Sequence, residues 1–281
     1  MKRIIYVALV LLVNMFLMAT CFAQAIPSHS DRETASSTKT IRLFNGRNLD
    51  GWYPFLQNRK RNEDPDKVFT VKKKMIHISG EEYGVIVTNE EYENYTLIVE
   101  FKWGKKTSGN RVNKARDNGI LLHSVGSDGG FRGLWMHSIE CQIIEGGTGD
   151  FYVVGDGSNQ FAITATVAAE KSNGNYIYQK DGKPVTINDG RISWYGRDPE
   201  WKDIKKFRGR QDIEKPTGKW NRLECIAKGD KITIILNGVL VNEATNVKPN
   251  KGRIQIQTEG AEIFFRRVDL LQSVEPIKSA S

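Results

Sequence analysis

Apolar and polar residues alternate along most of the chain from Thr40 onward. The clearest case is the segment 96–103, where every second residue from Leu97 to Trp103 is apolar and Glu100 and Lys102 fall between them. Successive side chains of a β-strand point to opposite faces of the sheet, so this period of two predicts a strand with one buried face.

Runs of this kind recur at short intervals, separated by turn residues. We expect strands at residues 40–44, 68–71, 75–78, 85–88, 119–124, 137–144, 151–154, 161–168, 220–227, 231–236, 239–242, 253–258 and 262–271. The pair Asn237-Gly238 between two of them is a strong signal for a two-residue hairpin turn. We find no amphipathic helix of four turns. The pattern therefore predicts a single all-β domain over residues 40–273, built as a sandwich of two packed antiparallel sheets.

The first 23 residues follow the pattern of a secretory signal peptide. Lys2 and Arg3 form a basic start, residues 4–18 are largely apolar, and small residues precede a cleavage point after Ala23. Cleavage there leaves 281 − 23 = 258 residues. The next stretch, residues 24–39, is rich in Ser, Thr and charge and is expected to be a flexible leader.

The same segment has a second interpretation, in which Cys21 carries a lipid anchor. Thr20 is a poor fit directly before a lipidated cysteine, so we rank this interpretation second. No later apolar run is long enough to span a bilayer. We therefore expect an exported protein, periplasmic or secreted, without a transmembrane span.

The composition narrows the classes of function. The 281 residues are 39% hydrophobic and 26% charged, as in ordinary globular proteins. The formal net charge is +8, but Lys and Arg are scattered among nearly as many acids, so no nucleic-acid partner is expected. The motifs GxSxG, HExxH and CxxC and the P-loop are absent, and no nucleotide cofactor is expected. Cys141 and Cys225 lie in apolar alternating runs and are interpreted as buried thiols.

The strand pattern weakens between residues 170 and 219, which are expected to form a long loop insertion. This stretch is polar but carries Tyr176, Tyr178, Trp194, Tyr195, Trp201 and Phe207. A loop of that length in a compact domain is usually functional or mobile. Its aromatic rings could form a platform for sugar rings, or a satellite hydrophobic cluster that holds the loop down, and the sequence leaves both interpretations open.

Polar side chains gather on one predicted sheet face in the middle of the chain. In the strand at 138–144, Glu140 and Gln142 point away from the apolar residues, and His123 ends the preceding strand at 119–123. Antiparallel pairing of the two strands would bring these three side chains together, although the register cannot be read from the sequence.

The surroundings of Glu140 decide between a solvated surface and a site. Polar residues on an outward sheet face are solvated by default. However, two of the four histidines, His123 and His137, flank Glu140, and Trp135 and Met136 would help to enclose it. A functional site is the hypothesis we favour, with the solvated face as its alternative.

Six segments carry a resemblance to a known family. They are LFNGRNLDGW at 43–52, DNGILLH at 117–123, IECQIIE at 139–145, GKWNRLEC at 218–225, ILNG at 235–238 and GRIQIQTEGAEIFFRRVDL at 252–270. In this order they resemble the 3-keto-disaccharide hydrolase family of exported bacterial proteins. The resemblance implies a concanavalin A-like jelly-roll fold and action on glycosides that a partner oxidoreductase has already oxidised at C3. The stretch 137–157 is similar to the branch of the family that acts as 1,2-lyases.

This implied chemistry explains the residue types. A ketone at C3 acidifies the proton on C2, so a base can remove it and the C1 substituent can leave by elimination, after which water can add. Such a site needs a base with a pKa near the working pH and a cation or donors beside the C3 oxygen. Glu140 and His123 suit either role.

A divalent metal would combine the two roles. Within the resemblance, His123, Glu140 and His137 are candidate ligands for Mn, Co or Zn. Residues expected to bind the substrate, most of them on polar strand faces, are Gln142, Lys102, Glu100, Trp135, Gln257 and Glu259.

Two other functions are compatible with the same fold. An ordinary glycoside hydrolase needs two carboxylates that flank the scissile bond. Glu140 and Glu145 offer a pair, but a spacing of five puts them on opposite faces of a strand unless a bulge intervenes. A non-catalytic carbohydrate-binding jelly roll would show aromatic platforms without an acid/base pair.

Overall fold

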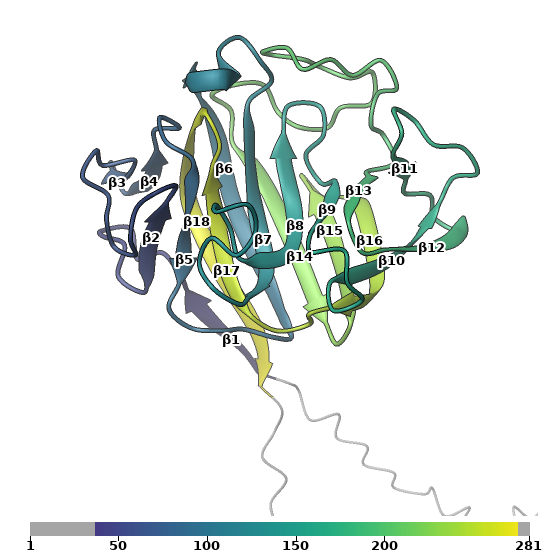
Figure 1. The fold of residues 1–281 in the computed structure, drawn as a ribbon, viewed down its shortest axis with the longest axis horizontal. Helices are drawn as coiled ribbons and strands as arrows, with labels where there is room; N and C mark the ends of the chain where they lie inside the picture. Colours follow the sequence, from purple (N-terminus) through teal and green to yellow (C-terminus); the bar gives the residue numbers. More distant parts are fainter. Residues whose placement is uncertain (1–36, 275–281) are drawn as a thin grey trace, which may run out of the picture. The chain divides into compact units, whose positions relative to one another are not determined.

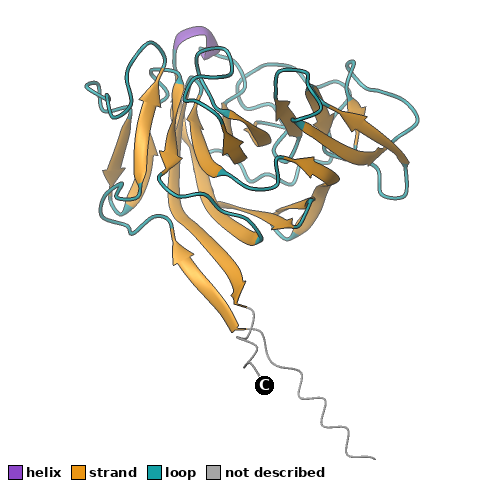
Figure 2. Cartoon of the chain, turned by 60° about the horizontal axis from the view of Figure 1, so that its bottom comes forward, coloured by secondary structure: helices purple, strands orange, loops and turns teal. Residues whose placement is uncertain are grey.

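A computed structural model of the chain describes residues 37–274, which form a sandwich of two β-sheets (Figure 1). The expected signal peptide, Cys21 and the leader up to residue 36 lie outside the described residues. In the described part, no helix has the length and apolar character needed to cross a membrane. The one helical segment between residues 37 and 274 is the short 3₁₀ turn η1 (Gly109–Arg111), drawn purple in Figure 2.

The ten-stranded sheet lies behind the other in the view of Figure 1. Its order is β12 (Lys183–Ile187), β10 (Ala162–Val167), β16 (Val239–Lys248), β15 (Lys231–Leu236), β14 (Asn221–Lys228), β6 (Tyr95–Thr107), β18 (Ala261–Val274), β4 (Met75–Ile78) and β3 (Phe69–Lys72), with β1 (Ser37–Arg42) paired to β18.

The eight-stranded sheet faces the viewer in Figure 1. Its order is β11 (Tyr176–Ile177), β13 (Gly190–Ser193), β9 (Phe151–Val154), β8 (His137–Ile144), β7 (Asp117–Val125), β17 (Arg253–Thr258), β5 (Gly84–Thr88) and β2 (Trp52–Leu56). β11 and β13 run parallel, whereas the other strands of this sheet pair antiparallel.

The predicted all-β jelly-roll sandwich is confirmed, and the predicted hairpins pair as expected. β3 pairs with β4, β14 with β15, and β15 with β16 across Asn237-Gly238. The prediction missed β2, because Pro54 interrupts its pattern. Proline is tolerated in this strand because β2 is the edge of its sheet.

Two predicted boundaries differ from the structure. β1 begins at Ser37, inside the expected leader, because its backbone pairs with the C-terminal end of β18. The expected loop over 170–219 contains three short strands, β11, β12 and β13. They are short and flank polar turns, so their sequences show little alternation.

The core lies between the two sheets. Leu97, Val99 and Phe101 of β6 are fully buried there, as the alternation of that strand predicts. Cys141 from one sheet and Cys225 from the other belong to the same core and are free thiols, as interpreted from the sequence. Burial raises the pKa of the Cys141 thiol well above its usual range, so this group is unreactive at neutral pH.

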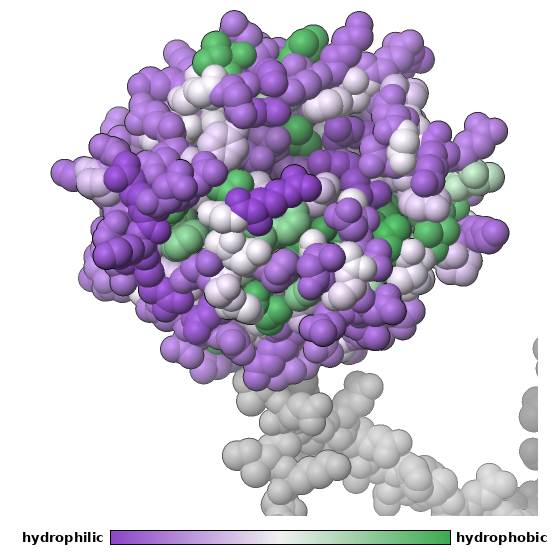
Figure 3. Space-filling view, in the orientation of Figure 1, coloured by the Kyte–Doolittle hydropathy of each residue, from purple (hydrophilic) through white to green (hydrophobic). Residues whose placement is uncertain are grey.

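The outer face of the eight-stranded sheet is also covered, over part of its area. The loop 126–136, between β7 and β8, folds across it and creates a second apolar cluster, which we call the outer cluster. Its buried members are Tyr53, Val85, Val87, Leu121, Phe131, Trp135, Met136 and Val154. Figure 3 looks onto this face and shows polar and apolar side chains side by side around a hollowed middle. A sheet face covered in this way can hold buried polar groups.

Candidate functional site

Glu140 lies near the middle of the outer face of the eight-stranded sheet. It projects from β8, where its register partners are Leu121 of β7 and Tyr152 of β9. Its side chain is on the predicted polar face, yet the residue is only 4% exposed. This burial excludes the interpretation of a solvated sheet face.

Gly119 of β7 lies directly beside the carboxyl group of Glu140. A Cβ atom at this position would clash with the side-chain oxygens Oε1 of Glu140 and Oε1 of Gln257. Glycine therefore leaves room beside the backbone, and the side-chain oxygens of Glu140 and Gln257 occupy it. The side chains of Glu140 and Gln257 converge over this bare stretch of backbone. We call this place the Gly119 hollow; charge effects and hydrogen bonds connect Asp117, Gln142, Arg191 and Glu259 to it.

Two of the side chains in the hollow have polar atoms without partners. Within residues 37–274, the buried atoms Glu140 Oε1, Gln257 Oε1 and Gln257 Nε2 make no hydrogen bond. A buried polar atom without a partner costs about 1–3 kcal/mol, and native proteins rarely leave one unsatisfied. The Gly119 hollow therefore has the properties of a binding site for a polar ligand.

Three carboxyl groups, those of Asp117, Glu140 and Glu259, lie close together here, and the charge of Asp117 acts on the other two. Burial, with a smaller effect from the charge of Asp117, raises the pKa of Glu140 to about 8. Burial raises the pKa of Asp117 to about 6, against the charge of Arg111. The pKa of Glu259 is raised well above its usual range by burial and then by Asp117 and Glu140. Burial thus favours the protonated form of each of the three groups.

Arg191 of β13 supplies a positive charge to the hollow. Its Nη2 donates to Gln142 Oε1 at 2.9 Å, and its Nη1 donates to Asp150 Oδ2 at 2.7 Å. Asp150 is fully buried and also accepts from Arg197 Nη1 at 2.8 Å. Gln142 in turn donates through Nε2 to Asp117 Oδ1 at 2.7 Å. This chain of hydrogen bonds fixes the guanidinium group, whose charge lowers the pKa of Glu140 against the larger effect of burial.

His123 does not join Glu140, contrary to the expectation. A bulge interrupts the pairing of β7 with β8 between Leu122 and Val125, and His123 has a φ of 53° inside it. The imidazole Nδ1 lies 3.0 Å from the carbonyl oxygen of Pro249, and the ring packs edge-on against Tyr95 of β6. Burial lowers the pKa of His123 to about 4, so the imidazole is neutral.

Glu100 and Lys102, two expected substrate-binding residues, belong to the other sheet. On the outward face of β6, Glu100 forms an ion pair with Arg266, and the ammonium group of Lys102 lies 4.8 Å from the centre of the Trp220 ring. The alternation of β6 predicted its polar face correctly. However, β6 belongs to the ten-stranded sheet, whereas Glu140 lies in the eight-stranded sheet. The other expected polar residues, Gln142, Gln257 and Glu259, do lie with Glu140.

The candidate metal ligands diverge. His137 stacks on Phe161 at 4.6 Å between ring centres, and its Nδ1 lies 3.3 Å from the carbonyl oxygen of Val154. His123 is in the bulge described above. Over residues 37–274, no three His, Cys, Asp or Glu side chains are placed to hold a metal ion together. The expected ligand set His123, Glu140 and His137 therefore does not fit a metal. Trp135 lies in the outer cluster, on the same sheet face as Glu140.

Glu145 is used to attach the segment 196–217 to the sandwich. Its Oε1 accepts from Arg116 Nη1 at 2.5 Å, and its Oε2 accepts from the backbone N–H of Lys206 at 2.8 Å. Trp201 Nε1 donates to the carbonyl oxygen of Glu145 at 2.8 Å, and the Trp201 ring packs against Phe207. These two aromatic residues thus form the satellite cluster that holds the segment down. Glu145 has no oxygen free to serve as a partner of Glu140.

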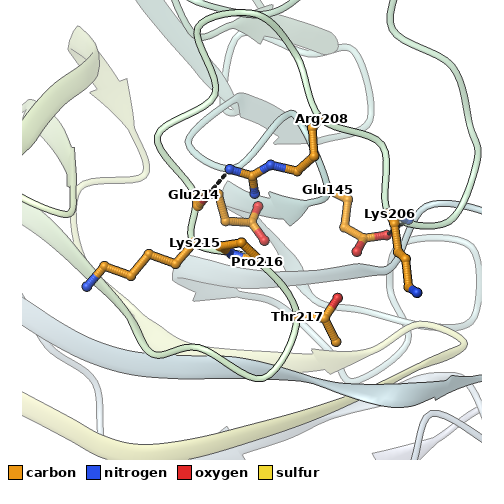
Figure 4. A pocket seen from close by; sticks show the side chains of 7 residues that line it. All are labelled: Glu145, Lys206, Arg208, Glu214, Lys215, Pro216 and Thr217. Carbon is orange, nitrogen blue, oxygen red and sulfur yellow. Dashed lines mark hydrogen bonds between the residues drawn. The ribbon is translucent and has the colours of Figure 1, made fainter.

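A cavity of about 340 Å³ lies beside this attachment and is lined by Glu145, Lys206, Arg208, Glu214, Lys215, Pro216 and Thr217 (Figure 4). The carboxyl groups of Glu145 and Glu214 both point toward this space. Burial raises the pKa of Glu214 to about 8. Its two oxygens accept hydrogen bonds from Trp103 Nε1 at 2.5 Å and from Thr148 Oγ1 at 2.6 Å. Both carboxyl groups are thus engaged in holding the protein together.

Sequence reasoning missed Asp117, Asp150, Arg191 and Arg197. Asp117 shares the period-two face of Gly119 and could have been found from that signal. Arg191 and Arg197 come from the weakly patterned segment, where no register can be read. Asp150 is the first residue after the turn that follows β8, and only the fold shows that it meets both arginines.

Comparisons with known proteins bear on the family. Residues 39–271 match the model of a family described as 3-keto-alpha-glucoside-1,2-lyase-like domain. No curated protein sequence matches. Similar solved structures include an inferred glycosyl hydrolase from Parabacteroides distasonis, with 17% identity, a TM-score of 0.48, and coverage of 84% of this chain and 94% of that one. The beta-glucanase of Bacillus licheniformis has 10% identity, a TM-score of 0.42, and coverage of 85% and 100%. The carbohydrate-binding module CBM66 of Bacillus subtilis has 11% identity, a TM-score of 0.40, and coverage of 78% and 94%. These structures are too distant to bear on the activity.

Proposed function

The chain belongs to the family of 3-keto-alpha-glucoside-1,2-lyase-like domains, a family of carbohydrate-acting enzymes, and on this premise we propose that it cleaves 3-keto-glucosides at C1. The observation that carries the proposal is the buried carboxyl group of Glu140, which has an unpartnered oxygen above the Gly119 hollow. The reaction is an elimination that begins with the proton on C2.

Glu140 is the base in this mechanism. Its ionised carboxylate removes the proton from C2, and the electron pair of that C–H bond forms a C2–C3 double bond while the ketone oxygen becomes an enediolate oxyanion. The oxyanion then becomes the C3 ketone again, and the electrons of the C2–C3 double bond form a double bond between C1 and C2. At the same time the bond from C1 to its oxygen substituent breaks. Addition of water to this product gives the free 3-keto sugar, so net hydrolysis follows from the same first step. A base whose pKa lies near the working pH suits such a proton transfer.

Arg191 and Gln257 hold the reacting sugar. The guanidinium group of Arg191, fixed by Asp150 and Gln142, provides a positive charge for the oxyanion on C3. A preorganised charge of this kind needs no rearrangement when the oxyanion forms and is typically worth about 3–4 kcal/mol of barrier. The unpartnered amide of Gln257 can donate to one sugar hydroxyl and accept from another.

Glu259 completes the mechanism as the acid. Burial, followed by the charges of Asp117 and Glu140, raises its pKa and favours the protonated form, which can transfer a proton to the departing oxygen on C1. The pathway also requires an oxidoreductase that converts the C3 alcohol of a glucoside into the ketone. We place both activities outside the cytoplasm, on the strength of the export signal expected in residues 1–23.

An ordinary glycoside hydrolase is the second candidate, and one observation favours it. Beyond the larger effect of burial, the charge of Asp117 raises the pKa of Glu140, and the charges of both raise the pKa of Glu259, so the three carboxyl groups lie close together. Any two of them could act as acid and nucleophile or acid and base at an unoxidised glycoside. In that mechanism the proton on C2 stays in place and a ketone at C3 is not needed.

One experiment separates the two candidates. A 3-keto-glucoside and its unoxidised parent are incubated with the protein in parallel, and the products are followed by NMR. We expect cleavage of the ketone only, because a secondary alcohol at C3 does not acidify the C2 proton. Comparable cleavage of the unoxidised parent would restore the ordinary hydrolase. If neither compound is cleaved, the enzymatic proposal fails and a binding function remains.

A further inference from the structure

We propose that one side of the sandwich carries a second carbohydrate-binding pocket, separate from the Gly119 hollow, whose ligand is a neutral oligosaccharide. A cavity of about 630 Å³ lies there, with Ile177, Tyr178, Gln179, Lys180, Tyr195 and Leu240 in its walls. None of these residues borders the Gly119 hollow. A volume of this size lies within the range typical of sites for small ligands.

The pocket lies where the edges of the two sheets meet. The N–H of Tyr178 donates to the carbonyl oxygen of Ser193 in β13 at 2.8 Å, and the N–H of Gln179 donates to that of Thr166 in β10 at 3.0 Å. β13 belongs to the eight-stranded sheet and β10 to the ten-stranded sheet. The segment 178–179 therefore bridges both sheets, and its backbone is fixed before a ligand arrives. Such preorganisation lowers the entropy cost of binding.

The chemistry of the walls is that of a surface for sugars. Tyr195 is 41% exposed and Leu240 is 40% exposed, so an aromatic ring and an aliphatic side chain face solvent together. The apolar C–H face of a saccharide packs on such side chains, while its hydroxyl groups need hydrogen-bonding partners. The lining residues Tyr195, Gln179 and Lys180 carry phenol, amide and ammonium groups that can serve as these partners.

The charge of the walls indicates a neutral ligand. Lys180 is the one charged residue among those that line the cavity, and no acidic side chain lines it. After the larger effect of burial, the charges of Glu243 and Asp181 raise the pKa of Tyr178, so these carboxylates offset the ammonium group and neither a cationic nor an anionic ligand would meet an unbalanced charge. A neutral chain of sugars satisfies both the apolar and the hydrogen-bonding groups. Such a pocket would keep the protein on a glycan while the Gly119 hollow acts on smaller glycosides, and binding at the pocket does not depend on turnover.

Calorimetric titration of the full protein with cellotetraose and with maltotetraose tests the proposal. We expect saturable binding of at least one of the two. Replacement Tyr195→Ala should weaken that binding at least about tenfold, equivalent to 1.4 kcal/mol. Tyr195→Phe retains the ring and should stay within about threefold, because stacking of the ring provides most of the contact. Tyr176→Ala is the matched control, because Tyr176 lies in the same segment outside the pocket, and it should leave the affinity unchanged.

Three outcomes would overturn the proposal. The first is an absence of binding by the wild-type protein with either sugar. The second is binding that survives Tyr195→Ala but is lost in Gly119→Ala, which would place the sugar in the hollow. The third is self-association of the protein that Tyr195→Ala removes, which would make this surface a contact between copies of the chain. Binding that persists in Glu140→Gln would show that the pocket stands independently of the proposed catalysis.

Discussion

Glu140 and Glu214 are two buried carboxyl groups that look alike by burial and charge but differ in their partners. Burial raises the pKa of both to about 8. Glu214 accepts hydrogen bonds from Trp103 and Thr148, one on each oxygen. Glu140 has an oxygen without a partner in the described residues and lies above the bare backbone of Gly119.

The difference separates a structural carboxyl group from a candidate catalytic one. A raised pKa alone marks both groups and cannot distinguish them. The partners can, because Glu214 compensates its burial with hydrogen bonds, whereas no described residue compensates the burial of Glu140 Oε1. Substitutions of Glu140, of Glu214 or of their neighbours should therefore affect catalysis and stability differently.

Replacement Glu140→Gln has the largest expected effect. Loss of the base should reduce kcat on a 3-keto-glucoside by about 10³-fold, within the range for general acid–base groups. The amide has nearly the same shape, so the circular dichroism spectrum should not change. Glu214→Gln is the matched control and should keep kcat within about twofold of the wild type. Equal losses in the two variants would remove the distinction.

Replacement of each glutamate by alanine should destabilise the protein more at Glu214 than at Glu140, the reverse of the order expected for kcat. Glu214→Ala leaves the buried donors of Trp103 and Thr148 without their acceptor, which should lower the free energy of unfolding by about 2–4 kcal/mol. Glu140→Ala breaks no hydrogen bond of the carboxyl oxygen Oε1 and should cost far less. Denaturant unfolding of the two variants measures this directly. A larger loss for Glu140→Ala would mean that its carboxyl group has a structural role.

Arg191→Lys tests the charge that faces Glu140. A lysine keeps the charge but cannot bridge Gln142 and Asp150 at once, so we expect kcat to fall about 30-fold, roughly 2 kcal/mol, with a smaller change in KM. Because Arg191 lowers the pKa of Glu140, a misplaced charge should move the pH profile of kcat/KM upward. A variant with unchanged kcat and an unchanged profile would exclude Arg191 from the mechanism.

The free energy of unfolding should fall with rising pH because the pKa of Glu140 is raised in the folded protein. The folded protein holds the proton of this carboxyl group up to about pH 8, whereas the unfolded chain releases it near its ordinary value of 4.5. The stabilisation that the folded state gains by holding this proton more tightly is fully present below pH 4.5 and is lost as the pH rises toward 8. The wild type should therefore lose up to about 1.4 kcal/mol per pH unit relative to Glu140→Gln in this range. Parallel curves of unfolding free energy for the two proteins would mean that the pKa of Glu140 is not raised.

The sequence was sufficient for most of the fold because the alternation is a local property. The strand at 96–103 and the hairpin at Asn237-Gly238 were both predicted from residues adjacent in the chain. The alternation of β8 also placed Glu140 and Gln142 on one face correctly. β2 was not predicted because Pro54 interrupts the alternation of apolar and polar residues. An edge strand tolerates such an interruption.

The site was less accessible because it depends on register and on tertiary contacts. A one-residue bulge at His123 moved the imidazole out of the site, and no feature of the sequence marks it. Glu100 and Lys102 have the right alternation but belong to the other sheet. Arg191 reaches the hollow from a short strand in the segment 170–219, held by Asp150 from a distant turn.

The most direct test of the central claim follows the hydrogen on C2. A 3-keto-glucoside deuterated at C2 is compared with the unlabelled compound, and a second reaction of the unlabelled compound is run in D₂O. If Glu140 removes the C2 proton, the label is lost from the deuterated substrate and a primary isotope effect accompanies cleavage whenever this step limits the rate. Products formed in D₂O then carry solvent deuterium at C2 after hydration. Cleavage with the original hydrogen fully retained at C2 would contradict the account.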